Sequence, residues 1–139
     1  MKKALLYRLF GVGKIPAAAV QALTTEGVVL MDEGLSGSVT YRNFRSPGRI
    51  SSYRKVGLIT SIAVTNKRLT AFSGNDPVID VELKDPRIKQ IAFSVESNGA
   101  LLAAFDASLF HDDWSGTLEY RFRTPLALQI IDHIELGSR

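Results

Sequence analysis

The sequence contains no cysteine and only two histidines. The absence of cysteine excludes disulfide bonds, thiolate nucleophiles, and zinc or iron–sulfur sites with cysteine ligands. With two histidines, little is available for histidine-based acid–base catalysis or for a metal site built from imidazoles. Both shortages weigh against an enzyme and against a metalloprotein.

Long hydrophobic runs are also missing. Lys2 and Lys3 precede a short apolar stretch, but Tyr7 and Arg8 interrupt it before it reaches the roughly 7–15 residues of a secretion signal. No segment approaches the roughly 20 apolar residues of a membrane-spanning helix. The 139 residues are therefore expected to form a cytoplasmic protein, with any membrane contact at the periphery of the bilayer.

Acidic residues are absent from one continuous part of the chain. Residues 34–75 carry seven cations and no acid, whereas residues 76–139 carry six cations and eleven acids. Such an asymmetry indicates an anionic partner. It is equally typical of a solvated hairpin whose charges suppress edge-to-edge aggregation, and the sequence leaves both interpretations open.

Catalytic and metal-binding constellations are incomplete. The adjacent residues 111–113 (His-Asp-Asp) could supply ligands, but neighbours in one loop rarely converge on a single ion. Asp80 and Glu82 would project from one face of a strand, where alternation with apolar residues explains them as solvent-facing. We find no set of nucleophile, base and orienting residue, so we predict no catalytic residue, no metal site and no cofactor.

Apolar residues recur with a helical period near the two ends of the chain and with a period of two between them. A short helix is predicted over residues 2–10, and a second begins at Pro16 and ends at Gly27. From Val28 onward we predict about seven strands, with tight turns at residues 46–48, 65–67 and 98–99. Thr124 and Pro125 then start a helix over residues 125–136.

The terminal helix carries an apolar stripe, which predicts that it covers one face or opening of the strands. The expected fold class is mainly β with a C-terminal helix and short N-terminal helices. The strands are expected to form an antiparallel seven-stranded barrel or bent sandwich, capped by helix 125–136. Residues 1–27 form an N-terminal helical extension, and residues 28–139 form the domain.

The segment Ser61–Phe72 resembles the "v-x-T-x-x-R-l" hairpin of bacterial PH-like and GRAM-like domains, with Thr65 and Arg68 as its polar positions. The resemblance extends over roughly residues 28–136. It implies the PH superfold and a non-catalytic interaction module. In PH domains that bind inositol phosphates, the first hairpin carries the basic residues.

Residues 41–55 hold five cations and three aromatic residues and fall on the first predicted hairpin. Arginine recognises phosphate through two parallel hydrogen bonds, and aromatic rings stack or insert. The candidate anion- or partner-binding residues are Arg42, Arg45, Arg49, Tyr53, Arg54 and Lys55.

The function expected is binding of an anionic surface or a protein partner through this basic hairpin. Two alternatives stay open at this stage. One is a structural protein that self-assembles into homo-oligomers through its sheet edges. The other is single-stranded nucleic-acid binding, which the same arginine, tyrosine and phenylalanine residues favour.

Overall fold

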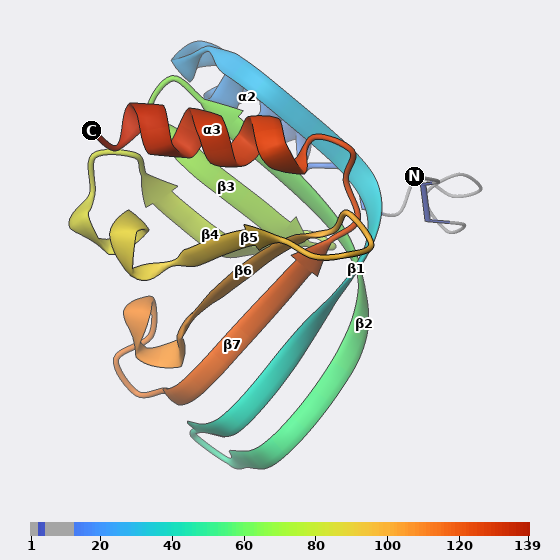
Figure 1. Ribbon diagram of the computed structural model, residues 1–139, viewed down its shortest axis with the longest axis vertical. Helices are drawn as coiled ribbons and strands as arrows, with labels where there is room; N and C mark the ends of the chain where they lie inside the picture. Colours follow the sequence, from blue (N-terminus) through green and yellow to red (C-terminus); the bar gives the residue numbers. More distant parts are fainter. Residues whose placement is uncertain (1–2, 5–12) are drawn as a thin grey trace.

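The computed structural model describes residues 3–4 and 13–139, and within them seven antiparallel strands form a single sheet (Figure 1). The strands are β1 (Val28–Ser46), β2 (Arg49–Thr65), β3 (Arg68–Ser73), β4 (Asp76–Glu82), β5 (Ala92–Val95), β6 (Leu101–Asp106) and β7 (Ser115–Phe122). The mainly β fold expected from the sequence is confirmed. The helix predicted over residues 2–10 lies outside the described residues, apart from residues 3–4.

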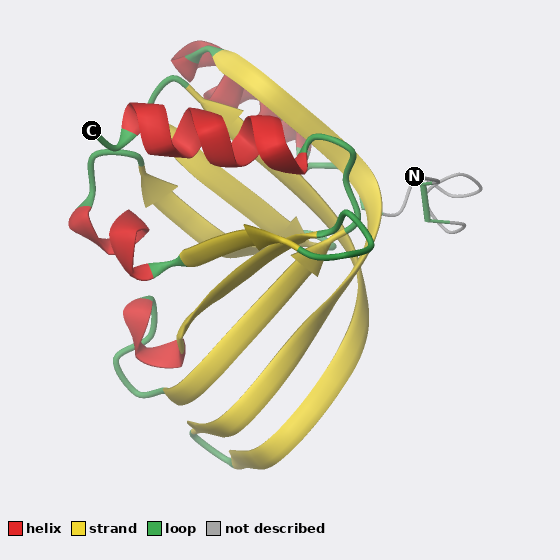
Figure 2. Cartoon of the chain, viewed as in Figure 1, coloured by secondary structure: helices red, strands yellow, loops and turns green. Residues whose placement is uncertain are grey.

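The sheet has the strand order β4-β3-β2-β1-β7-β6-β5 and curls into an open half-barrel (Figure 2). Its long β1 and β2 strands form the bent wall, because β1 pairs with β2 along its whole length and with β7 on its other side. The two end strands, β4 and β5, are not paired with each other. The curl therefore leaves an inner and an outer face.

The inner face holds the main core. Period-two alternation places Ile62 and Val64 of β2 in this core, together with Ile79 and Val81 of β4. The C-terminal helix α3 (Ala127–Gly137) covers the upper part of the inner face, as the stripe in its sequence predicts (Figure 1). Its residues Ile130 and Ile134 belong to the same buried cluster.

A second helix, α2 (Ala17–Glu26), packs on the outer face. Its Leu23 joins Ile15, Ala63 and Phe72 in a separate buried cluster. The helix ends at Gly27, which adopts the left-handed conformation with φ 88°, so the predicted second helix and its stop are confirmed. None of the described helices is both long and apolar enough to cross a bilayer.

The β2–β3 turn is fastened by its own polar residues. The Thr65 hydroxyl accepts hydrogen bonds from the backbone N–H groups of Lys67 (3.1 Å) and Arg68 (3.0 Å). The Arg68 guanidinium then donates to Glu26 of α2 and to Asp80 of β4, both at 2.8 Å. One arginine thus connects the outer helix, the turn and the edge strand.

Three local expectations are corrected. The terminal helix runs from Ala127 to Gly137 instead of 125–136. Thr124 holds the turn that precedes the helix, because its hydroxyl accepts the N–H of Leu126 (3.1 Å) and donates to Asp32 (2.8 Å). Ile88 is expected to belong to the strand marked by Ile91, Phe93 and Val95. It lies instead in the short 3-10 helix η1 (Pro86–Gln90), since Asp85 accepts the N–H of Arg87 and starts that turn.

The third correction concerns the residue with a positive backbone φ. The sequence allows this conformation at Asn66 in the β2–β3 turn, because asparagine adopts it more readily than most residues. Among the described non-glycine residues, it is Asn43 that has a positive φ, at 49°. Asn43 lies where the pairing of β1 with β7 shifts register between Arg42 and Arg45. The β-bulge there, rather than the turn, requires the left-handed conformation.

Candidate functional site: a basic hairpin and the polar pocket beside it

The far end of the β1–β2 hairpin, residues 41–55, is called here the hairpin tip. It projects below the part of the half-barrel that α3 covers (Figure 1). Ser46 pairs with Arg49 across the turn, and Gly48 takes a positive φ of 75°, which suits a proline–glycine turn. Between Arg49 and Leu58, β2 pairs only with β1, because the Ile59 carbonyl accepts the N–H of Gly74 (2.9 Å) and pairing with β3 begins at Thr60. The tip therefore has a free strand edge.

Three of the predicted site residues share the outer face of the tip. Arg42 lies opposite Tyr53, and Lys55 lies opposite Thr40. The two cross-strand pairs are two positions apart along the strands, so their side chains lie on the same face of the sheet. The Arg42 guanidinium sits 5.2 Å from the centre of the Tyr53 ring. This distance is within the range of a cation–π contact.

Two other predicted residues face inward. Arg54 lies opposite Tyr41, whose ring packs against the core on the inner face. The Arg49 guanidinium lies 5.8 Å from the centre of that same ring. Arg45 follows the bulge at Asn43 and is exposed. The structure thus divides the six predicted residues between two faces of one hairpin and does not gather them in one cleft.

Internal pairing neutralises one cation of the tip. Arg42 donates to Glu119 of β7 at 2.8 Å, and Glu119 also accepts from Arg121 at 3.2 Å. The hydrogen bond to Glu119 and its negative charge raise the pKa of Arg42. Burial acts to raise the pKa of Glu119, but the hydrogen bonds from the two arginines outweigh it, and that pKa is lowered.

The acid-free stretch of the sequence is only partly compensated by acids from elsewhere. Arg42 and Arg68 have carboxylate partners outside the stretch. Hydrogen bonds to Asp80 and then Glu26 raise the pKa of Arg68. The cations of the stretch that make no ion pair with any described residue are Arg45, Arg49, Arg54, Lys55 and Lys67. Four of these five lie on the hairpin tip, which is therefore basic in the folded protein.

The aromatic residues of the tip have different exposures. Tyr53 is 58% exposed, whereas Phe44 is 1% exposed and packs edge-on against Tyr41 and Trp114. The turn also presents Ile50, which is 73% exposed. The tip thus offers one aliphatic and one aromatic side chain to a partner, flanked by unpaired cations.

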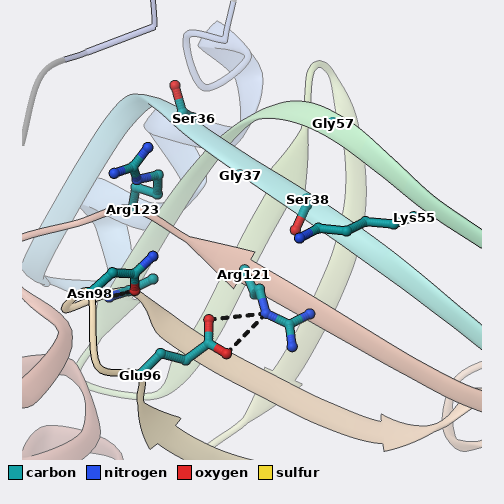
Figure 3. A pocket seen from close by; sticks show the side chains of 10 residues that line it. Ser36, Gly37, Ser38, Lys55, Gly57, Glu96, Asn98, Arg121 and Arg123 are labelled. Atoms are coloured by element: carbon teal, nitrogen blue, oxygen red, sulfur yellow. Dashed lines mark hydrogen bonds and ion pairs between the residues drawn. The ribbon is translucent and has the colours of Figure 1, made fainter.

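Beside the tip, the outer face carries a polar pocket of about 520 Å³ (Figure 3). Gly37 and Gly57 leave part of its wall without side chains. An added Cβ on Gly37 would lie only 2.4 Å from the Arg121 carbonyl oxygen, so a larger residue does not fit there. The other residues that line the pocket are Ser36, Ser38, Lys55, Glu96, Asn98, Ala100, Arg121 and Arg123.

The charges in this pocket are of two kinds. Arg121 is held by Glu96 through hydrogen bonds of 3.0 and 3.1 Å (Figure 3). It also donates to the Thr40 hydroxyl at 3.1 Å. Lys55 and Arg123 make no ion pair with any residue in the described ranges. The pocket therefore has one arginine, Arg121, whose charge is neutralised, and two cations, Lys55 and Arg123, that can bind an anion.

Sequence reasoning identified Lys55 but missed the rest of this pocket. Arg121 and Arg123 alternate with Leu118, Tyr120 and Phe122 in β7, and this pattern marks them only as residues of the polar face. Their approach to Lys55 depends on the pairing of β7 with β1 and of β1 with β2. No local signal in the sequence reports that pairing.

The other polar candidates lie apart from the tip. Residues 111–113 are exposed, and the His111 ring stacks on Trp114 with 3.6 Å between ring centres. Asp80 and Glu82 both lie within 4 Å of Arg68. No protein-family model matches the chain, and no curated protein matches it in sequence. The candidate site therefore rests on the geometry alone.

Proposed function

We propose that the protein is a non-catalytic, PH-like interaction module that docks onto an anionic membrane surface through its hairpin tip. One observation carries this proposal. Arg45, Arg49, Arg54 and Lys55 make no ion pair with a described residue, and the exposed Ile50 at the turn lies opposite Arg45 and next to Arg49. Unpaired cations attract acidic headgroups, and an apolar side chain beside them enters the interface of the bilayer.

The side chains at the tip favour a bilayer over a nucleic acid. Binding of single strands relies on aromatic side chains on which successive bases stack. Phe44 is buried and Tyr41 packs against the core, so only Tyr53 is an exposed ring on the tip. Ile50 has no role in contacting a sugar–phosphate backbone, whereas burial of an aliphatic side chain in lipid is favourable.

The PH-like assignment has separate support. Seven antiparallel strands that curl, with a C-terminal helix over the open sheet, agree with the superfold that the resemblance implies. Thr65 and Arg68, the polar positions of the resembling segment, fasten the β2–β3 turn. In this proposal the half-barrel is a scaffold, and the hairpin tip is the part that contacts the membrane.

The test is co-sedimentation with vesicles in which phosphatidylserine makes up about a third of the lipid. The test variant changes Arg45, Arg49, Arg54 and Lys55 to serine. Each cation near an anionic surface contributes about 1 kcal/mol, so the four changes should weaken binding several hundredfold. The binding of the unchanged protein should also decrease steeply as salt is added.

A matched control removes four charges elsewhere, by changing Lys14, Lys67, Lys84 and Lys89 to serine. These lysines are exposed and lie outside the tip, so the control should keep most of the affinity. Equal loss in both variants would mean that net charge alone acts, and would contradict the proposal. Binding to single-stranded DNA or to heparin without binding to vesicles would contradict it as well.

A second candidate function is self-assembly, which the free edge of β2 between Arg49 and Leu58 favours. An unpaired strand edge is a template for pairing with a second chain. Analytical ultracentrifugation separates the two functions. A stable dimer that persists at high salt, together with an absence of vesicle binding, would support assembly in place of docking.

A further inference from the structure

The inner face of the half-barrel contains a cavity that the hairpin proposal does not use. It has a volume of about 300 Å³ and lies between β1, β7 and the loop before β7 on one side and the β3–β4 turn on the other. Its aromatic lining residues are Tyr41, Phe105, Phe110, Trp114 and Tyr120. Aliphatic side chains of β1, β2, β4 and β7 also line it, and Ser73, Asp76 and His111 add polar groups to the wall. Sites for small molecules have this mainly apolar lining, and the volume is at the lower end of their range.

The hydroxyl groups of two tyrosines in this wall are available to a ligand. Tyr41 and Tyr120 both line the cavity, and neither hydroxyl makes a hydrogen bond with another residue that the structure describes. Burial, with a smaller effect from Tyr41, raises the pKa of Tyr120. Its hydroxyl therefore keeps its proton at neutral pH and can donate a hydrogen bond.

Positive charge lies next to Tyr41. The Arg49 guanidinium lies 5.8 Å from the centre of the Tyr41 ring, and Arg54 is the cross-strand partner of Tyr41. Neither arginine makes an ion pair with a residue in the described ranges. Asp76, which is exposed, supplies the one carboxylate among the residues that line the cavity. The charge next to the hydroxyls is thus positive, and a single acid belongs to the β3–β4 side.

We propose that this cavity binds a small apolar carboxylate, such as a medium-chain fatty acid. Its chain would lie among the aromatic and aliphatic side chains, and its carboxylate would accept hydrogen bonds from the hydroxyls of Tyr41 and Tyr120. Arg49 is close enough to Tyr41 to balance the negative charge. None of the residues that line the cavity belongs to the four docking cations of the proposed function, but Arg49, one of those cations, lies beside both sites.

The single tryptophan of the chain provides the measurement, because Trp114 lines the cavity. Octanoate is titrated while the tryptophan fluorescence is followed, and a saturable change is expected at concentrations below about 1 mM. Burial of each methylene group strengthens binding about fourfold, so butanoate should bind about two hundredfold more weakly than octanoate. Octyltrimethylammonium, which has a similar chain and the opposite charge, should bind at least about tenfold more weakly.

Two kinds of variant locate the ligand. Val78→Phe fills the cavity from its β4 wall and should abolish the saturable change, whereas Leu128→Phe, on an exposed position of α3, should leave it unaltered. Tyr120→Phe removes one hydroxyl with little change in shape and should weaken octanoate about tenfold. The tyrosine variant keeps the test decisive if Val78→Phe does not fold.

Three results would overturn the inference. They are the absence of a saturable change with octanoate, octanoate binding that Tyr120→Phe leaves unchanged, and tighter binding of octyltrimethylammonium than of octanoate. The last result would assign the cavity to a cation held by the aromatic rings and Asp76. Vesicle binding by Val78→Phe should equal that of the unchanged protein, so failure here is distinguishable from failure of the hairpin proposal.

Discussion

The base and the tip of the β1–β2 hairpin are made by the same two strands, yet their surroundings are opposite. In the base, residues 60–65 of β2 are all buried, with β1 on one side and β3 on the other. In the tip, residues 49–55 of β2 are exposed apart from Ser51, and their only partner is β1. The difference shows that the neighbours of a strand decide whether its residues stabilise the fold or remain available to a partner.

Charge follows the same division. Near the base, Arg68 is paired with acids from two other elements, so its charge serves the fold. At the tip, four cations have no carboxylate partner among the described residues. The comparison predicts that changes in the base lower stability, whereas changes of exposed, unpaired residues of the tip lower binding and leave stability nearly unaltered.

The largest expected effect is on stability in the base. Ile62→Ala removes a side chain that is 1% exposed in the main core and should lower the free energy of unfolding by about 2–5 kcal/mol. The matched change Ile50→Ala in the tip should alter it by less than about 0.5 kcal/mol. Urea unfolding followed by circular dichroism measures both values. Similar losses from the two changes would remove the distinction between base and tip.

An intermediate effect is expected within the tip itself. Arg45→Ser removes an unpaired cation and should weaken binding to phosphatidylserine vesicles about fivefold. Arg42→Ser removes a cation that Glu119 already neutralises, and should weaken binding by less than about twofold. A larger loss from Arg42→Ser than from Arg45→Ser, in the same sedimentation assay, would show that ion pairing does not determine which cations bind.

The smallest effect concerns the ion pair that holds Arg42 to β7. The lowered pKa of Glu119 means that this carboxylate stabilises the fold above the pKa of an unfolded glutamate, about 4.3. The contribution is lost as the pH falls through the lower pKa of the folded protein. Glu119→Gln should therefore cost about 0.2–1 kcal/mol at neutral pH, and the cost should approach zero once the pH is below the lowered pKa of Glu119.

Urea titrations of both proteins at several pH values measure this difference. A cost that stays constant across the acid range would mean that the Glu119 side chain acts by packing and not by its charge. The binding of vesicles by Glu119→Gln at neutral pH should rise slightly, since Arg42 then loses its neutralising partner.

Local patterns in the sequence were sufficient for the elements. Alternation in residues 79–84 predicted a half-buried strand, and Ile79, Val81 and Leu83 are buried while Asp80, Glu82 and Lys84 are exposed. The Asn98-Gly99 turn joins β5 to β6 as expected. These features were predictable because side-chain direction along a strand and turn conformation depend on neighbouring residues.

The boundaries of the terminal helix were less predictable. Thr124 has the chemistry of a helix cap and its hydroxyl accepts the N–H of Leu126, but the same hydroxyl also donates to Asp32, 92 residues away in the sequence. Where a residue type can play either of two roles, the partner that the fold brings to it decides which role it plays. For the same reason the bulge at Asn43 was not foreseen, since it arises from the pairing of β1 with β7.

By itself the sequence determined the fold class, the basic character of residues 41–55 and the exposure of much of that segment, because composition and periodicity are local properties. Only the tertiary structure decided which cations are neutralised, that Arg42 and Arg49 lie on opposite faces of the tip, and that Tyr41 and Tyr120 share a cavity. The physical reason is that electrostatic pairing and cavity lining depend on contacts between strands distant in sequence. Those contacts exist only once the sheet has curled.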